Sequence, residues 1–429
     1  MTHGVNRVRD LVLDLWTKTR IDWGFATDRL ALAFRRERSL SSADRRVVAE
    51  TLYGMIRQLR RIDFALDGQR FAGPAREHAR YLAYRVLAGE LSPAAAAGEL
   101  AADWDAVARV DERIARERDP VRRLGLLRSL PDWLARRLLD DHGDEADALA
   151  AALNARAPLA VRANALKTTR AALADRLAAE GIASHPGRWA AAALVLDTRT
   201  NAFGLAAFRE GLFEVQDEAS QLVAELVAPP ARGLVVDACA GAGGKTLALG
   251  ALLANRGRLW ALDVDAKKLA ELTRRARRAG LSNHRAVAVP PDAYPDEVEA
   301  LHGRADRVLV DAPCSGIGAL RRNPEARWRL ADDDIPRLQA QQLAIARRAM
   351  GLVAPGGRLV YATCTVLREE NQAVVERLLR PGWEVMRIAE IWGNERAAPV
   401  ADSTGSFLAM LPHRHDTDGF FAAVLYRRS

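Results

Sequence analysis

Two of the three cysteines in this chain of 429 residues lie just beyond short apolar stretches that are typical of buried strands. Cys314 ends the segment Asp311-Ala-Pro-Cys after residues 308–310, and Cys364 follows residues 359–361. A single cysteine in such a place is usually a small buried hydrophobic residue. Two of them at the ends of successive strands favour chemistry instead. One thiolate would act as a nucleophile, and a second group would assist proton transfer or release.

A glycine-rich loop, Asp237-Ala-Cys-Ala-Gly-Ala-Gly-Gly-Lys-Thr246, follows the apolar stretch 234–236 and precedes a predicted helix. A phosphate-binding P-loop requires glycine where Cys239 stands, and a dinucleotide fingerprint requires glycine where Thr246 stands. A third interpretation is a loop whose backbone amides approach the carboxylate of S-adenosylmethionine. Asp263, at the end of the next apolar stretch, is placed to accept hydrogen bonds from ribose hydroxyls. A tight turn without a ligand remains the alternative.

A methyl donor at this loop would give the thiols a specific task. Addition of a thiolate to C6 of a pyrimidine turns C5 into an enamine carbon that attacks a methyl group. A base must then remove the C5 proton so that the thiolate leaves. Asp311 is expected to hydrogen-bond the ring at N3 and its exocyclic amine, which favours cytosine, or else to cap the next helix. Lys245 is a candidate cation that would stabilise the thiolate. The residues alone leave open which of Cys314 and Cys364 is the nucleophile.

The cysteines and the glycine loop must be positioned by secondary structure, and from about residue 234 onward the sequence predicts alternating strands and helices. Short apolar strands are predicted at 234–236, 259–262, 286–289, 308–310, 359–361 and 420–425. This alternation predicts a doubly wound parallel α/β sheet, in which ligands bind beyond the carboxyl ends of the strands. Residues 1–118 predict a helical bundle, and residues 131–230 mix helices with short strands. We therefore expect three domains: an all-α domain at 1–130, a small α+β domain at 131–228 and a Rossmann-like α/β domain at 229–429.

Composition narrows the class of protein. Basic residues number 63 and acidic residues 55, which gives a net charge of +8. Most of this excess lies in the N-terminal third, so we expect a polyanionic partner such as RNA, although a general preference for arginine also explains it. Three cysteines cannot form a disulfide framework, and the apolar runs are too short to span a bilayer. We expect a cytoplasmic protein with no membrane partner and no metal.

Several motifs together resemble the Fmu/Sun family of RNA cytosine-5 methyltransferases. They are Phe213-Glu-Val-Gln-Asp-Glu-Ala-Ser220, the glycine loop, Asp311-Ala-Pro-Cys-Ser-Gly316, Arg321-Arg-Asn-Pro324 with Trp328, Tyr361-Ala-Thr-Cys-Thr365, Glu369-Glu-Asn371 and Asp418-Gly-Phe-Phe421. The segment 40–54 is similar to the NusB-like helical RNA-binding domain that marks the bacterial ribosomal-RNA branch of this family. Residues 153–164 look like the RNA-facing domain of the family.

The resemblance implies roles for single residues. Cys364 would be the nucleophile, and Cys314 would assist release of the product. The S-adenosyl-L-methionine site would be lined by Cys239, Ala240, Gly241, Ala242, Gly243, Gly244, Lys245, Asp263, Asp292 and Asp311. Two departures from the family pattern stand out: Gly241-Ala242 replaces Ala-Pro in the loop, and Pro290-Pro291 precedes Asp292 where the family has glycine. The second departure makes Asp292 the weakest of these assignments.

The resemblance also implies a substrate, a cytosine in small-subunit rRNA. We expect the enzyme to be a monomer. Arg321, Arg322 and Trp328 are candidate RNA contacts, with a solvated arginine pair and a core tryptophan as the alternatives. A transfer-RNA methyltransferase is a second hypothesis, which the NusB-like segment disfavours. A non-catalytic RNA-binding assembly factor is a third, which the two cysteine motifs disfavour. A nicotinamide-dependent dehydrogenase is the most distant, because the glycine loop fails the dinucleotide fingerprint.

Overall fold

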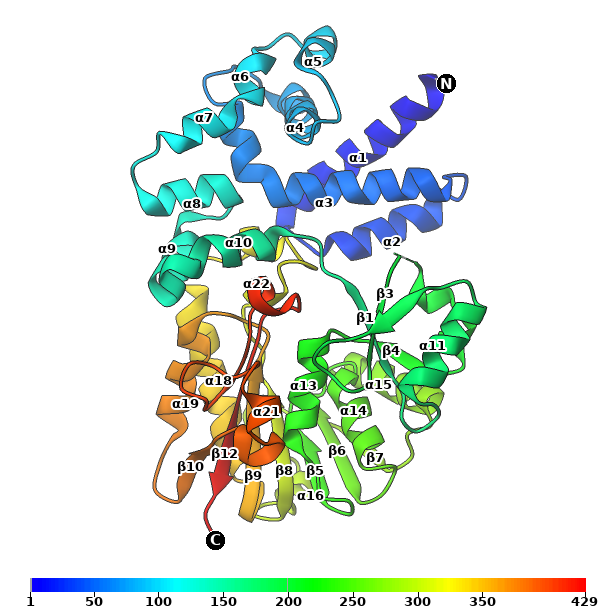
Figure 1. Ribbon diagram of the computed structural model, residues 1–429, viewed down its shortest axis with the longest axis vertical. Helices are drawn as coiled ribbons and strands as arrows, with labels where there is room; N and C mark the ends of the chain where they lie inside the picture. The colour runs from blue at the N-terminus through cyan, green and yellow to red at the C-terminus, as the bar shows by residue number, and fades with distance from the viewer. Residues whose placement is uncertain (1, 199) are drawn as a thin grey trace. The chain divides into compact units, whose positions relative to one another are not determined.

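The computed structural model describes residues 2–198 and 200–429, which fold into two compact units (Figure 1). Unit 1 comprises the chain up to Ala155 together with residues 319–332, and unit 2 comprises residues 156–318 and 333–429. Met1 and Arg199, which fall in the expected ranges 1–130 and 131–228, lie outside the described residues. The three-domain division stays a prediction, but residues 131–155 and 319–332 pack within unit 1.

Unit 1 is helical, as expected from its apolar periodicity. A capping box at Ser41 and Asp44 begins its longest helix, and Trp16, Met55 and Ile62 are fully buried in its core. Its helices are α1 (Thr2–Asp22), α2 (Ala26–Arg36), α3 (Ser42–Ala65), α4 (Gly73–Leu87), α5 (Pro93–Glu99), α6 (Trp104–Ala108), α7 (Val110–Ala115), α8 (Pro120–Arg128), α9 (Asp132–His142), η1 (Gly143–Glu145) and α10 (Ala146–Asn154).

The segment 319–332, which contains α17 (Ala326–Arg329), returns to this helical unit. The indole nitrogen of Trp328 donates to the carbonyl of Ile56 over 2.8 Å, and its ring lies 6.1 Å from that of Trp23. Arg327 is fully buried and donates to Asn154 Oδ1 over 2.9 Å. Trp328 is therefore half-buried and packs against the core of unit 1. Of the two alternatives for Trp328, the structure shows the packing contact.

Unit 2 begins with a small antiparallel sheet in the order β2-β3-β1-β4. The short strands expected within residues 131–230 include β1, whose register joins Arg162 to Glu214 of β4. The elements of this part are β1 (Leu159–Ala163), α11 (Arg170–Ala179), β2 (Ser184–Pro186), β3 (Ala193–Leu196), η2 (Ala202–Gly204), α12 (Ala206–Arg209) and β4 (Phe213–Val215).

The rest of unit 2 is a Rossmann-like α/β fold whose sheet has the strand order β10-β12-β9-β8-β5-β6-β7, with β11 paired to β12. Its strands are β5 (Leu234–Asp237), β6 (Arg258–Asp263), β7 (His284–Ala288), β8 (Ala305–Asp311), β9 (Val353–Thr363), β10 (Trp383–Met386), β11 (Leu408–Met410) and β12 (Phe420–Arg427). Its helices are α13 (Glu218–Val227), α14 (Gly244–Leu252), α15 (Ala266–Ala279), α16 (Asp296–Glu299), η3 (Ile317–Ala319), α18 (Asp334–Met350), η4 (Arg368–Glu370), α19 (Gln372–Leu378), α20 (Ala389–Trp392), α21 (Asn394–Ala397) and α22 (Pro412–His415).

The expectation of a wholly parallel sheet is corrected at one side. Strands β5 to β9 pair in parallel, whereas β12 pairs antiparallel with both β9 and β10. Parallel pairing needs a crossover connection that carries the chain back to the same end of the sheet. The apolar run that predicts β12 carries no information about its direction, which the preceding connection decides.

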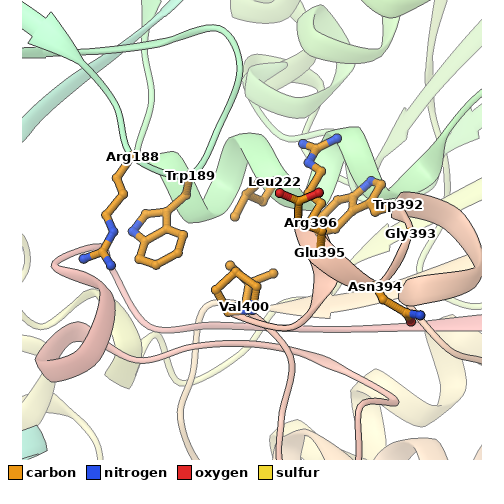
Figure 2. A pocket seen from close by; sticks show the side chains of 10 residues that line it. Arg188, Trp189, Leu222, Trp392, Gly393, Asn394, Glu395, Arg396 and Val400 are labelled. Carbon is orange, nitrogen blue, oxygen red and sulfur yellow. The ribbon is translucent and has the colours of Figure 1, made fainter.

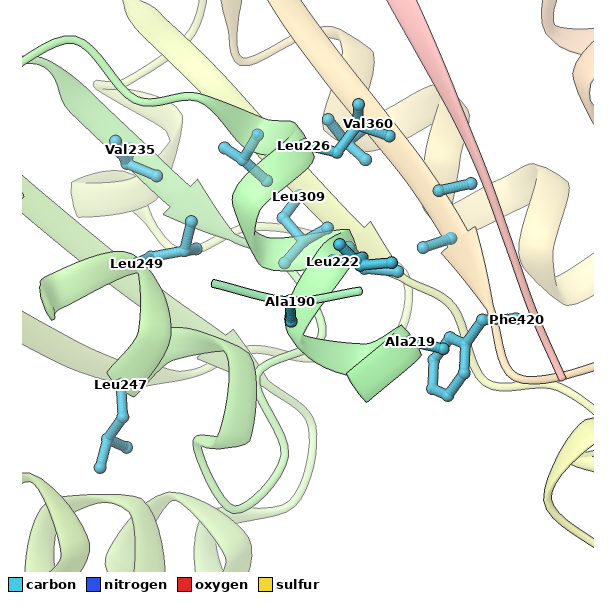
Figure 3. Packing of buried hydrophobic residues seen from close by; sticks show 14 of the residues in the cluster. Ala190, Ala219, Leu222, Leu226, Val235, Leu247, Leu249, Leu309, Val360 and Phe420 are labelled. Carbon is cyan, nitrogen blue, oxygen red and sulfur yellow. The ribbon is translucent and has the colours of Figure 1, made fainter. Parts of the chain in front are cut away.

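The parallel register brings the ends of the central strands to one edge. Asp237 pairs with Ala261 and with Leu309, and Asp311 pairs with Ala362. Helices bury one face of this sheet: Figure 3 shows Val360 of β9 among the residues that pack with α13 and α14. In the described ranges, no helix is both long and apolar enough to cross a membrane.

Candidate active site

The loops after β8 and β9 bring the two predicted cysteines together. Because Asp311 and Ala362 are register partners, the residues that follow each strand leave the sheet side by side. The Sγ atoms of Cys314 and Cys364 lie 3.4 Å apart, and both side chains are half-buried. The backbone amide of Gly318 donates to the carbonyl of Cys364 over 3.0 Å, which ties the first loop to the second.

The two thiols are not equivalent. The hydrogen bond to Cys364, followed by burial and the nearby Glu370 carboxylate, raises the pKa of Cys314 well above its ordinary value. Cys314 is therefore held as a neutral thiol in hydrogen-bonding contact with the Cys364 sulfur. The third cysteine, Cys239, has its pKa raised by burial and by the neighbouring Asp237 and Asp311, so it also stays protonated.

A buried lysine side chain lies close to Cys314 and Cys364. Lys245 Nζ donates to Asp311 Oδ2 over 2.6 Å and lies 4.9 Å from the ring centre of Phe420. Burial lowers the pKa of Lys245, but the carboxylate of Asp311 and the charges of Cys364 and Asp237 together raise it above its ordinary value. The ammonium group therefore stays charged, within electrostatic reach of the Cys364 sulfur.

A buried carboxylate, for which the motifs predict no role, connects the two cysteine loops. Glu370 is fully buried and accepts hydrogen bonds from the Ser315 amide at 2.8 Å and from Ser315 Oγ at 2.5 Å. Gln342 Nε2 donates to the same carboxylate over 2.9 Å, and Ser315 Oγ also reaches Thr365 Oγ1 at 3.0 Å. The Glu369-Glu-Asn371 motif was the only signal in the sequence, and its spacing predicts no partner. Glu370 fixes the residue after Cys314 relative to the residue after Cys364.

The glycine loop has the conformation that its composition predicts. Gly241 and Gly243 have positive φ angles of 52° and 90°, which residues with a side chain rarely adopt. A Cβ atom on Gly243 would lie 2.6 Å from Leu272, so that position requires glycine. A Cβ atom on Gly241 or Gly244 would meet open space, and α14 begins there without a side-chain cap.

The acidic residues expected at the cofactor site differ in their surroundings. Asp263 Oδ2 accepts from the Gly241 amide over 2.8 Å, and its Oδ1 accepts from the Asp265 amide over 2.8 Å, so it also shapes the loop. Val264, directly after it, is 61% exposed, which leaves an apolar side chain uncovered beside the acid. Asp292 is exposed beyond β7, and no hydrogen bond or ion pair of its side chain occurs within the described ranges.

These residues fit S-adenosyl-L-methionine. The open faces of Gly241 and Gly244 and the uncapped start of α14 suit a carboxylate, because backbone amides there point outward. Carboxylate oxygens of Asp263 keep lone pairs for ribose hydroxyls beyond the two backbone contacts. The exposed Val264 offers apolar surface for a purine ring.

Arg275 of α15 supports the loop from behind. Its Nη1 donates to the carbonyl of Ala242 over 2.6 Å, while its Nη2 pairs with Glu214 of β4 over 2.9 Å. We expect Arg275→Ala to weaken binding of S-adenosyl-L-methionine about tenfold, because a charge-assisted hydrogen bond of this kind is worth about 1.5–3 kcal/mol. Isothermal titration calorimetry measures this change. Arg274→Ala, on the exposed side of the same helix, is the control and should leave the affinity unchanged. Equal affinities for both variants would contradict the role of Arg275.

A second buried carboxylate lies under the loop and makes stability depend on pH. Burial raises the pKa of Asp237 to about 7, although Thr246 Oγ1 donates to its Oδ2 over 2.7 Å. The folded state thus holds a proton that the unfolded chain releases near pH 4, so folding stability falls as pH rises from about 4 to about 7.

Asp237→Asn should remove this loss. Relative to the natural protein, the variant should gain about 2–3 kcal/mol of stability between pH 5 and pH 8. Melting temperatures of both proteins at the two pH values test this expectation. The same substitution at the exposed Asp175 is the control and should show no such trend. An advantage of Asp237→Asn that is independent of pH would contradict a raised pKa.

Comparison with known proteins agrees with this geometry. The sequence profile of the 16S rRNA methyltransferase RsmB/F family matches residues 224–426, and that of the ferredoxin-like domain of RsmF/B-like methyltransferases matches residues 130–202. The chain is 37% identical over 314 residues to the probable ribosomal RNA small subunit methyltransferase B of Bacillus subtilis, covering 72% of this chain and 69% of that protein. It is 31% identical over 416 residues to the protein of the same name from Synechocystis, covering 90% and 92%.

The fold has a counterpart over nearly its whole length. The crystal structure of PH0851 aligns with a TM-score of 0.78 and 25% identity, and the alignment covers 97% of this chain and 98% of that one. The protein is thus a methyltransferase that uses S-adenosyl-L-methionine. By sequence and by fold, the chain belongs to the 16S rRNA methyltransferase RsmB/F family.

Proposed function

We propose that this enzyme methylates C5 of a cytosine in small-subunit rRNA and that Cys364 forms a transient covalent bond to C6 of that base. The observation that carries the proposal is the 3.4 Å contact between Cys314 and Cys364 beside the Lys245–Asp311 ion pair. The relatives named as small-subunit rRNA methyltransferases support the RNA class. The cysteine pair supports a pyrimidine C5 as the acceptor, because this carbon needs a nucleophile to activate it.

Cys364 acts as the nucleophile in this scheme. Its thiolate adds to C6, and the electron pair of the C5=C6 bond moves onto C5. When bound, S-adenosyl-L-methionine supplies the electrophilic methyl group that C5 accepts. The Lys245 ammonium carries its positive charge close to the Cys364 sulfur. Once the Cys364 sulfur is bonded to C6, its hydrogen bond and charge no longer raise the pKa of Cys314, so Cys314 gives its proton to solvent and as a thiolate accepts the C5 proton. The electron pair of the C–H bond then restores the C5=C6 bond and expels the Cys364 thiolate.

Cys314 assists the release of the product. A group close to Cys364 must move a proton at the end of the reaction, and Cys314 is in hydrogen-bonding contact with that sulfur. Glu370 and Ser315 hold the Cys314 loop at this distance. A sulfur held this way is available for proton transfer without competing for C6.

Asp311 and the glycine loop hold the two substrates. The Asp311 carboxylate accepts a hydrogen bond from the exocyclic amine of cytosine, and from N3 when that nitrogen is protonated, while Lys245 fixes the orientation of the carboxylate. The cofactor site comprises Cys239, Ala240, Gly241, Ala242, Gly243, Gly244, Lys245, Asp263, Asp292 and Asp311. Among these, Asp292 has the weakest support, because it is exposed and none of the described contacts fixes its side chain.

The remainder of the chain would bind the RNA backbone. We assign a NusB-like RNA-binding role to the all-α region 1–130 and an RNA-facing role to the α+β region 131–228, with 229–429 as the catalytic domain. C5 and C6 of a stacked base are poorly accessible, so the enzyme acts on single-stranded or locally opened RNA. Arginine-rich surfaces give this binding a strong dependence on salt.

The test identifies both the methylated nucleoside and its position in the rRNA. Purified enzyme, methyl-labelled S-adenosyl-L-methionine and unmodified 16S rRNA should yield labelled 5-methylcytidine after nuclease digestion, and bisulfite sequencing should find one protected cytosine. Transfer RNA under the same conditions should remain unlabelled. Label in another base, or label in transfer RNA alone, would overturn the proposal.

A further inference from the structure

Unit 2 contains a cavity of about 760 Å³ whose lining comes from outside the glycine loop and the cysteine loops. The lining residues come from the turn between β2 and β3, from α13 and from the region of α20 and α21 (Figure 2). They are Arg188, Trp189, Leu222, Trp392, Gly393, Asn394, Glu395, Arg396, Pro399 and Val400. A volume of this size accommodates a ligand as large as a nucleotide.

Two tryptophans, each with an arginine, form the walls of this cavity. Trp189 and Trp392 lie on opposite sides of it in Figure 2. The guanidinium carbon of Arg188 lies 4.4 Å from the ring centre of Trp189, and that of Arg396 lies 4.5 Å from the ring centre of Trp392. An indole beside a guanidinium group offers a flat surface for a base and a positive charge for a phosphate.

Hydrogen bonds and one ion pair hold the walls of the cavity in place, and of the two arginines only Arg188 keeps its charge free of an acidic partner among the described residues. Trp189 Nε1 donates to the carbonyl of His415 over 2.8 Å, and the amide of Trp189 donates to Glu218 over 2.8 Å. Arg396 pairs with Glu225 of α13. A rigid aromatic wall loses little conformational freedom when a ligand stacks against it.

The balance of charge favours an anionic ligand on one side. Arg188 is exposed, and no acidic side chain within residues 2–198 and 200–429 pairs with it. Leu222 and Val400 are buried apolar residues between the two tryptophans. The lining also contains the exposed carboxylate of Glu395, which lies near Trp392 in Figure 2, so an anion is expected on the Arg188 side. Aromatic walls with an unpaired arginine at one edge suit a nucleobase that enters with its phosphate outside, next to Arg188.

We propose that this cavity binds one unpaired nucleotide of the RNA substrate, outside the site where the target cytosine reacts. The base would stack in the space between Trp189 and Trp392, and the phosphate would contact Arg188. This inference rests on the proposed function, because it takes the ligand to be part of the RNA that the enzyme methylates. It gives the enzyme a means of holding a locally opened strand.

Ultraviolet cross-linking of the full-length enzyme to unmodified 16S rRNA tests the placement directly. After digestion, mass spectrometry should find nucleotide adducts on peptides that contain Trp189 or Trp392. Cross-links confined to other peptides would overturn the inference.

Two variants test the energetics. Trp392→Ala should weaken RNA binding about tenfold, because stacking of one base on an aromatic ring has that magnitude. Arg188→Ala should weaken it severalfold and reduce the salt dependence by about one released ion. Affinity for S-adenosyl-L-methionine should stay unchanged in both, measured by calorimetry. Trp383→Ala on β10 and Arg380→Ala beside it are the matched controls and should bind RNA normally.

The outcomes separate this inference from the proposed function. If the natural enzyme methylates rRNA and both cavity variants bind it with unchanged affinity, the cavity has no role in RNA binding. If a variant loses S-adenosyl-L-methionine binding together with RNA binding, the cavity residues are structural and the inference fails. If the natural enzyme forms no 5-methylcytidine, the proposed function fails, while the cross-links still report whether RNA occupies the cavity.

Discussion

Cys364→Ala is expected to abolish methyl transfer, by more than about 10,000-fold, while binding of S-adenosyl-L-methionine stays unchanged. Loss of a nucleophile has an effect of this size because the remaining groups cannot replace the covalent step. The substitution leaves the Lys245–Asp311 pair and the glycine loop in place, so the cofactor should bind normally. Transfer of labelled methyl groups to 16S rRNA, with calorimetry of cofactor binding, measures both quantities.

Two further cysteine variants complete this experiment. Cys239→Ala alters the cysteine of the cofactor loop, which burial and neighbouring acids hold as a thiol, so this variant should weaken cofactor binding without abolishing methyl transfer. Cys364→Ser retains a small polar group but not the nucleophilicity of sulfur and should be as inactive as Cys364→Ala. Substantial turnover by either Cys364 variant would show that another group attacks C6.

Cys314→Ala should form the covalent bond to RNA but release it slowly. Denaturing gel electrophoresis with labelled RNA should show protein joined to RNA, in an amount close to that of the active enzyme. The physical reason is the 3.4 Å contact, which makes Cys314 the thiol closest to the bond that must break. Without this group, the proton movement that accompanies release loses its partner.

The double variant Cys314→Ala with Cys364→Ala separates this adduct from nonspecific attachment. It should form no adduct, because the adduct requires the Cys364 thiolate. Free protein alone in the single Cys314→Ala variant, with normal turnover, would remove Cys314 from the release step. An adduct that persists in the double variant would place the covalent bond on another residue.

Much of the site was predictable because it depends on strand order and strand ends. A parallel sheet places every carboxyl end at one edge, so residues just after strands are brought near one another. Cys314, Cys364 and the loop before α14 follow this rule. The glycine loop was also predictable, because glycines between a strand and a helix are typical of a tight turn. Only the structure shows that a side chain on Gly243 would collide with Leu272.

Other features could not be predicted from the sequence. Trp328 looked equally suited to RNA and to a core, and only its hydrogen bond to Ile56 shows the packing contact. Glu370 gave no sign of joining the two cysteine loops, because its partners Ser315 and Gln342 are 55 and 28 residues away. Nothing in the sequence distinguishes Arg275 from the other arginines, and only its hydrogen bond to the carbonyl of Ala242 reveals its role.

The amino-acid order by itself determined the alternation of strands and helices, the glycine loop and the two thiols at strand ends, since local periodicity and backbone preferences specify these features. The tertiary structure alone decided the antiparallel direction of β12, the return of residues 319–332 to the helical unit and the difference between the two thiols. These properties depend on which distant groups meet and how deeply they are buried, and neither spacing nor composition encodes burial at a single atom.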